Sequence, residues 1–178
     1  MPVDMKGVIA ETYMAMIKKG NVDKITVKAL IEECHISRQT FYYHFQDIMD
    51  VLEWSCRQVT ERLVQETLKA ESPGAAIRTF VSFSVDNYPM LKKLMDSQKR
   101  SQIERLLLDT AEAYLRELVR YKNSDLSMNY SDMEVTLRFI ACGMIGVLLK
   151  YSGSPQVDKE KLAVQLQQIL LRGIPEKV

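Results

Sequence analysis

The segment that most constrains the fold is TVKALIEECHISRQTFYYHF, residues 26–45. Thr26 and Ser37 are residue types that cap helices, and each precedes a short run of helical character. Only Cys34, His35 and Ile36 lie between the two runs, so the connection is too short to have structure of its own. The segment therefore predicts two short helices that cross sharply, as in a helix-turn-helix element that reads DNA.

The rest of the chain predicts helices throughout. We expect helices at about residues 4–19, ended by Gly20, at 47–67, and after Ser72, which is placed to cap a helix that Pro73 begins. Further helical periodicity covers 75–86, 90–96, 101–121, 131–151 and 158–172, with turns at 87–89, 123–129 and 152–155. No convincing strand pattern occurs. The predicted fold is all-α, with a three-helix helix-turn-helix domain at 1–46 and a helical effector-binding and dimerisation domain at 47–178.

Composition narrows the class of protein. The chain has 178 residues, of which 47% are hydrophobic, enough for one large core or two small ones. Its longest apolar run, 139–149, is interrupted by small residues and is shorter than the roughly 20 residues that span a bilayer. The amino terminus has no secretory pattern, so we expect a cytoplasmic protein with no membrane partner.

Catalytic and metal sites find no support in the sequence. The three cysteines, Cys34, Cys56 and Cys142, are far apart, so we interpret them as buried thiols and not as disulfide or zinc partners. The two histidines, His35 and His44, both lie in the helix-turn-helix segment without a partner at recognisable spacing. We therefore expect no enzyme activity and no cofactor.

Charge argues against strong non-specific DNA binding. The net charge of the chain is +1, and residues 1–50 carry six Lys and Arg against seven Asp and Glu. A specific dimer whose few cations lie on one face remains compatible with these numbers, because distribution matters more than the sum.

The second helix of the pair has the side chains that base reading requires. Arg38, Gln39 and Thr40 can contact guanine, adenine and thymine edges, whereas Phe41 and Phe45 are spaced to face inward. Tyr and His side chains at the end of the helix can donate to phosphate oxygens. The DNA-binding candidates are Thr26, Ser37, Arg38, Gln39, Thr40, Tyr42, Tyr43 and His44.

A capped helix, a short turn, the run S-x-x-T-F-Y-x-H-F and then a long helix together resemble the tetracycline-repressor-like (TetR) family over roughly residues 5–55. The resemblance implies a homodimer with a DNA-binding domain at each amino terminus and an all-helical effector domain. In that family the positions matching Thr40, Tyr42 and His44 commonly touch phosphates, and those matching Arg38 and Gln39 lie toward the bases. The run at 45–54 is similar to a branch associated with dihydroxyacetone-kinase operons, whose members can act as activators with a kinase-like protein partner.

Two positions depart from the family pattern. His35 stands where the family usually has Gly, so we expect a positive φ at this residue. Ile48 stands where the family commonly has a phosphate-contacting Lys, so one anchoring charge is missing.

The carboxy-terminal half supplies candidates for dimerisation and for ligand binding. Small residues in an apolar helix allow close helix approach, and a final apolar helix could complete a four-helix interface; contact within one chain is the alternative. The dimer candidates are Cys142, Gly143, Gly146, Leu162, Leu166 and Ile169. Ligand candidates, which ordinary core packing would explain equally, are Phe83, Tyr88, Met95, Leu107, Tyr114 and Met144, with Arg138 as a possible anchor for an anion or an ion-paired residue.

The favoured hypothesis is a dimeric transcription regulator that binds a palindromic double-stranded DNA operator and responds to a small-molecule or protein effector. The competing hypothesis is a protein-interaction adaptor, or an activator dependent on a partner, with weak intrinsic DNA binding. The charge of residues 1–50 and the apolar Ile48 favour this alternative.

Overall fold

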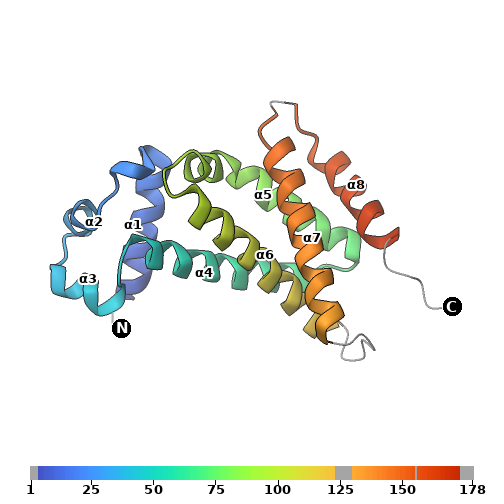
Figure 1. Cartoon of the computed structure of the whole chain (residues 1–178), viewed down its shortest axis with the longest axis horizontal. Helices are drawn as coiled ribbons and strands as arrows, with labels where there is room; N and C mark the ends of the chain where they lie inside the picture. The colour runs from blue at the N-terminus through green and yellow to red at the C-terminus, as the bar shows by residue number, and fades with distance from the viewer. Residues whose placement is uncertain (1–3, 123–129, 155, 173–178) are drawn as a thin grey trace. The chain divides into compact units, whose positions relative to one another are not determined.

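The computed structural model describes residues 4–122, 130–154 and 156–172. Its helices are α1 (Met5–Lys19), η1 (Val22–Lys24), α2 (Val27–Cys34), α3 (Arg38–His44), α4 (Ile48–Leu68), α5 (Pro73–Met95), α6 (Arg100–Lys122), α7 (Tyr130–Tyr151) and α8 (Lys159–Arg172) (Figure 1). No strand occurs in these ranges, which confirms the all-α prediction. None of the described helices is long and apolar enough to cross a bilayer. The turn predicted at 123–129 and Pro155 lie outside the described residues.

Polar side chains cap the helix starts, as the sequence predicts at Ser72. Asp4 accepts a hydrogen bond from the Gly7 N–H at 3.1 Å, and Ser72 accepts one from the Ala75 N–H at 3.2 Å. Each such bond pairs a first-turn N–H that has no partner within its own helix. Helix boundaries therefore match the predicted ones closely at α1, α4, α6, α7 and α8.

The predicted turn at 87–89 is wrong, because α5 continues through Pro89. Proline inside a helix removes one backbone hydrogen bond and costs about 3 kcal/mol. The cost is offset by burial on both sides of the proline, where Val81 is fully buried and Leu94 is 5% exposed. Asn87 Nδ2 also donates to the Phe83 carbonyl at 2.8 Å, so the polar side chain before the proline is satisfied within the helix.

The described chain forms two compact units that alternate along the sequence. The first contains residues 1–59 and 89–106, and the second contains 60–88 and 107–178. Helices α4, α5 and α6 each supply residues to both units. The amino-terminal helices therefore share a unit with a segment that the sequence assigns to the other domain.

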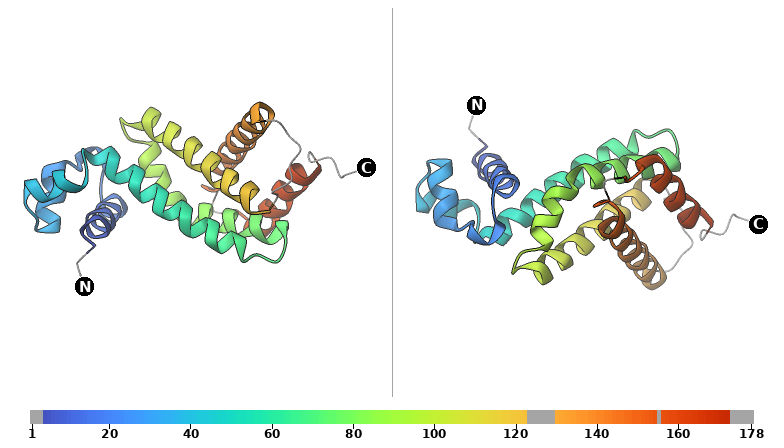
Figure 2. Two further views of the ribbon diagram at one scale, coloured as in Figure 1. Left: turned by 90° about the horizontal axis from the view of Figure 1, so that it is seen from below. Right: turned by 90° about the horizontal axis from the view of Figure 1, so that it is seen from above.

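Aromatic side chains form the centre of the first unit. Phe41 is fully buried and Phe45 is 2% exposed, with their ring centroids 6.2 Å apart, as their spacing predicts. Phe45 also meets Trp54 of α4 edge to face at 6.1 Å. Ile9, Tyr13 and Ile17 of α1, together with Leu30, Val51 and Leu52, complete this core. Figure 2 shows α1, α2 and α3 gathered together in both of its views.

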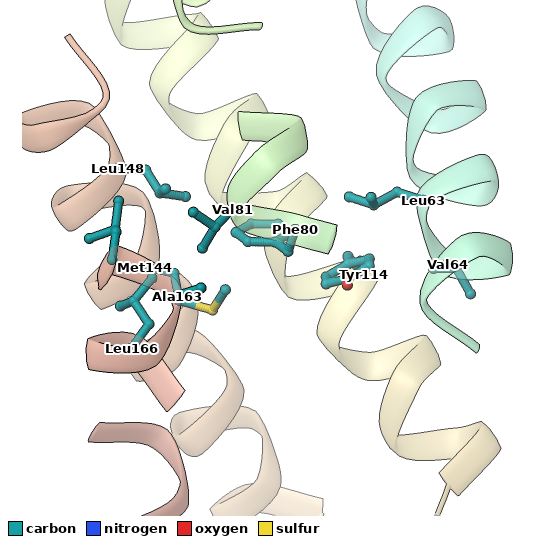
Figure 3. Packing of buried hydrophobic residues seen from close by; sticks show 10 residues of the cluster. Leu63, Val64, Phe80, Val81, Tyr114, Met144, Leu148, Ala163 and Leu166 are labelled. Atoms are coloured by element: carbon teal, nitrogen blue, oxygen red, sulfur yellow. The ribbon is translucent and has the colours of Figure 1, made fainter. Parts of the chain in front are cut away.

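The second unit has its own apolar core, drawn in Figure 3. The ring of Phe80 stacks on that of Tyr114 at 5.2 Å, and the Tyr114 hydroxyl pairs with Thr67 Oγ1 at 2.8 Å. Burial raises the pKa of Tyr114 to about 12, which keeps the phenol neutral. Helices α7 and α8 contribute Met144, Leu148, Leu162, Ala163 and Leu166.

Tyr114→Phe tests the buried hydroxyl pair. The substitution keeps the stacked ring and removes one partner of the fully buried Thr67, so we expect the free energy of unfolding to fall by about 1 kcal/mol. Urea unfolding measures the change. Tyr43→Phe, which removes a hydroxyl from a residue 83% exposed, is the control and should alter stability by less than about 0.5 kcal/mol. Equal stabilities for the two variants would contradict this account of the core.

Candidate nucleic-acid interface

His35 makes the turn between α2 and α3. Its backbone is left-handed, with φ 52° and ψ 41°, and among the described non-glycine residues it alone has positive φ. The His35 N–H donates to the Glu32 carbonyl and the Ile36 N–H donates to the Ile31 carbonyl, both at 3.2 Å. These two bonds form a Schellman motif, which satisfies carbonyls at the end of α2. The predicted positive φ is confirmed.

Ser37 and Thr40 fix the start of α3. Ser37 Oγ accepts a hydrogen bond from the Thr40 N–H at 2.9 Å, and the two hydroxyls lie 2.8 Å apart. Thr26 Oγ1 accepts from the Ala29 N–H at 3.1 Å and caps α2 in the same way. All three hydroxyl groups stand at helix N-termini, where backbone N–H groups and the helix dipole favour an anion such as phosphate.

The outer face of α3 is polar and aromatic. Arg38 and Gln39 are exposed, whereas Phe41 points into the core. Tyr42 is 52% exposed and Tyr43 is 83% exposed. Both side chains are therefore accessible to another molecule, although the Tyr42 ring also packs edge to face on Phe41 at 5.3 Å.

Position 48 belongs to the core. Ile48 is 7% exposed in the first turn of α4, so this position offers no charge to a phosphate. A different cation stands near the end of α3: Lys6 Nζ of α1 lies 5.3 Å from the centroid of the Phe45 ring. Sequence reasoning missed Lys6, because its contact joins two residues distant in the chain.

The predicted ligand residues do not gather at one place. Tyr114 and Met144 are buried in the core of the second unit and Phe83 packs against that core, whereas Met95 belongs to the first unit. Tyr88 lies against Gly153, where a Cβ atom would come within 2.7 Å of the Tyr88 ring.

Arg138 is ion-paired. Its Nη1 lies 2.8 Å from Asp109 Oδ1 and 3.3 Å from Glu112 Oε2, and the hydrogen bond to Asp109 raises the pKa of Arg138. A shallow depression on α6 lies beside this pair and is lined by Asp109, Glu112, Ala113, Arg116 and Glu117. Ion pairing was the alternative that the sequence left open for this residue.

The dimer candidates divide into an exposed group and a buried group. Cys142, Gly143 and Gly146 are exposed on α7, and Ile169 of α8 is 67% exposed. The prediction of buried thiols is therefore wrong for Cys142, which lies on the outer face of α7, whereas Cys34 and Cys56 are half-buried. The buried group is Leu162 and Leu166, which pack into the core of their own chain.

No protein-family model and no curated protein sequence matches this chain. Several solved structures match over nearly its full length. The dihydroxyacetone kinase operon activator DhaS is 19% identical, with a TM-score of 0.65 and 94% of each chain covered. A TetR transcriptional regulator from Streptococcus agalactiae is 14% identical, with a TM-score of 0.64, covering 93% of this chain and 92% of that one. The fatty acid degradation regulator FadR from Bacillus halodurans is 13% identical, with a TM-score of 0.59, covering 99% of this chain and 100% of that one.

Identities this low show a shared fold. Several structural neighbours of this chain are named as TetR-family transcriptional regulators, so its fold is one that such regulators share. The resemblance found at residues 5–55 is thus confirmed in three dimensions and extends over the carboxy-terminal helices.

Substitutions at His35 test the turn. His35→Gly permits φ 52° without a Cβ penalty, so we expect stability within about 1 kcal/mol of the parent. His35→Val places a β-branched residue in the left-handed region and should lower the free energy of unfolding by about 1–2 kcal/mol relative to the glycine variant. Thermal and urea unfolding measure both effects. A valine variant as stable as the glycine variant would show that the turn does not hold this conformation in solution.

Proposed function

We propose that this protein is a dimeric DNA-binding transcription regulator of the TetR type. The single observation that carries the proposal is the α2–α3 element, in which capped helices and the His35 turn hold α3 with its aromatic side buried and its polar side exposed. The likeness in fold to transcription regulators supports it.

Each candidate residue has a role that its position supports. Arg38 and Gln39 are exposed in the first turn of α3, where recognition helices contact base edges. Tyr42 and Tyr43 can donate hydrogen bonds to phosphates. The hydroxyls of Thr26, Ser37 and Thr40 lie at helix N-termini, where a phosphate is favoured, and His44 ends α3 beside Tyr43. Lys6 adds a cation near the end of α3, in place of the phosphate-contacting charge that Ile48 does not supply.

The first experiment is a gel shift with the DNA that lies upstream of the gene encoding this protein. It is run over a salt series with random DNA as competitor. A specific complex that weakens as salt rises is the expected result, because phosphate contacts release counterions. No specific shift at low salt would overturn the proposal in favour of the adaptor, which the negative charge of residues 1–50 favours.

Arg38→Ala tests direct readout. If Arg38 contacts a base, its loss should cost about 1–3 kcal/mol of operator affinity and relax sequence preference at one position. Binding to a panel of operator variants measures both effects. Arg100→Ala removes a similar charge, which is paired with Glu104 at 3.7 Å outside the α2–α3 element, and should leave sequence preference unchanged. An unchanged preference in Arg38→Ala would show that this helix does not read bases through Arg38.

The dimer part of the proposal rests on the outer face of α7. Among the described residues, no heavy atom lies within 4 Å of a Cβ placed at Gly143 or Gly146, so packing within the chain does not require glycine there. One turn before them, Phe139 is 80% exposed, and Val135 is 69% exposed. An apolar knob beside a flat, small-residue surface is the kind of face that a partner covers.

A two-fold axis makes this face self-complementary. When two copies of one helix cross antiparallel about an axis between Cys142 and Gly143, Phe139 of one copy comes opposite the partner's Gly146, and each phenyl ring then fills the space that the glycine leaves. The same pairing brings the two Cys142 thiols near the axis. Leu162 and Leu166 would support the interface from behind, through the core of their own chain.

Phe139→Lys tests the dimer. A charge within this face should give a monomer in sedimentation velocity at micromolar concentration, because an unpaired buried charge is costly at an interface. Glu134→Lys, at an exposed position on another side of α7, is the control and should stay dimeric. A dimer that survives Phe139→Lys would place the interface elsewhere.

The proposal also includes control by an effector that binds the second unit, and a sense of regulation, which is activation. The neighbour DhaS is named as an operon activator, and residues 45–54 resemble that branch, which supports activation as the sense of regulation. A reporter placed behind the operator should then rise in expression when the protein is supplied.

A further inference from the structure

One lysine ties the end of α1 to a distant part of the chain. Lys93 Nζ, near the end of α5, donates to the carbonyls of Lys18 at 2.6 Å and Ile17 at 3.3 Å. Carbonyls in the last turn of a helix have no partner within the helix, and an ammonium group there also complements the helix dipole. Lys93 therefore acts as a cap supplied from another helix.

A second hydrogen bond holds the connection between α1 and α2 near its other end. The Gln98 N–H donates to Asp23 Oδ1 at 3.0 Å, while the Asp23 N–H donates to Asn21 Oδ1 at 2.8 Å. Asp23 lies in η1, which leads directly to Thr26, the cap of α2. Hydrogen bonds from Lys93 and Gln98 thus hold the chain between α1 and α2 at its beginning and again just before α2 starts.

The segment that makes these hydrogen bonds, residues 93–98, is held in place by burial and by a hydrogen bond of its own. We call it the corner, because it joins α5 to α6 (Figure 1). Leu94 is 5% exposed, Met95 is 7% exposed, and Ser97 Oγ donates to the Leu94 carbonyl at 2.7 Å. The corner and α1–α3 also belong to the same compact unit.

We infer that the corner positions the DNA-reading helices, with Lys93 and Asp23 as positioning residues. The inference rests on the proposed DNA binding and names two residues that position its reading helix. Helix α1 contacts both α2 and α3, so fixing its end fixes the exposed face of α3. Loss of either set of hydrogen bonds therefore loosens the hold on α1 and changes how firmly α3 is held.

The first test is independent of DNA. Lys93→Met removes the ammonium and keeps a long apolar stem, and Lys92→Met makes the same change at the exposed neighbour. We expect amide hydrogen exchange at residues 17–25 to accelerate on the order of tenfold in Lys93→Met and to stay unchanged in Lys92→Met. Equal exchange in the two variants would overturn the inference.

The second test separates positioning from simple stability. At a temperature where all variants are folded, Lys93→Met and Asp23→Ala should each lower the ratio of specific to non-specific DNA affinity on the order of tenfold. Lys92→Met and Glu71→Ala change exposed residues of the same charges outside the corner, so both variants should keep the ratio of the parent. A ratio unchanged in Lys93→Met, despite faster exchange, would show a purely structural cap and overturn the inference. Failure of the parent protein to bind any operator would instead overturn the proposed function. The exchange experiment would still decide whether Lys93 holds the end of α1.

Discussion

The left-handed conformation of His35 is the constraint on which the rest of the reading element depends. A residue at φ 52° reverses the chain within one position, which lets Ser37 begin α3 only two residues later. Because α3 is short, its direction at the start decides which side chains reach the core. With this turn, Phe41 is buried while Arg38 and Gln39 face outward.

The roles of individual acids reconcile the negative net charge of residues 1–50 with the DNA binding that we propose. Several carboxylates of this segment accept hydrogen bonds from backbone N–H groups and thereby stabilise helix starts and turns. Asp4 caps α1, Asp47 caps α4, Asp50 accepts from the Gln46 N–H, and Asp23 accepts from the corner. A carboxylate used at a helix N-terminus is partly neutralised by the dipole it faces. The count of charges in the sequence therefore overstates the repulsion that DNA would meet at α3.

Helix α7 has two apolar sides with different partners. Its inner side, with Met144 and Leu148, packs into the core of the second unit. Its outer side, with Phe139 beside Gly143 and Gly146, has no such partner among the described residues. A second apolar side on a helix needs a second surface to cover it. This requirement connects the fold of one chain to the proposed dimer, and it explains why Cys142 lies in an apolar run and yet is exposed.

The sequence by itself determined the features encoded within a few residues: the all-α class, the capping residues, the positive φ of His35 and the inward spacing of Phe41 and Phe45. Each depends on local hydrogen bonding or helical periodicity. Tertiary structure alone decided the features that join distant residues. Burial on both sides carries α5 through Pro89, packing makes Ile48 a core residue, and Lys93 reaches carbonyls in α1. These outcomes depend on which surfaces meet after the helices form, and helical periodicity reports only that a face is buried, without saying against what.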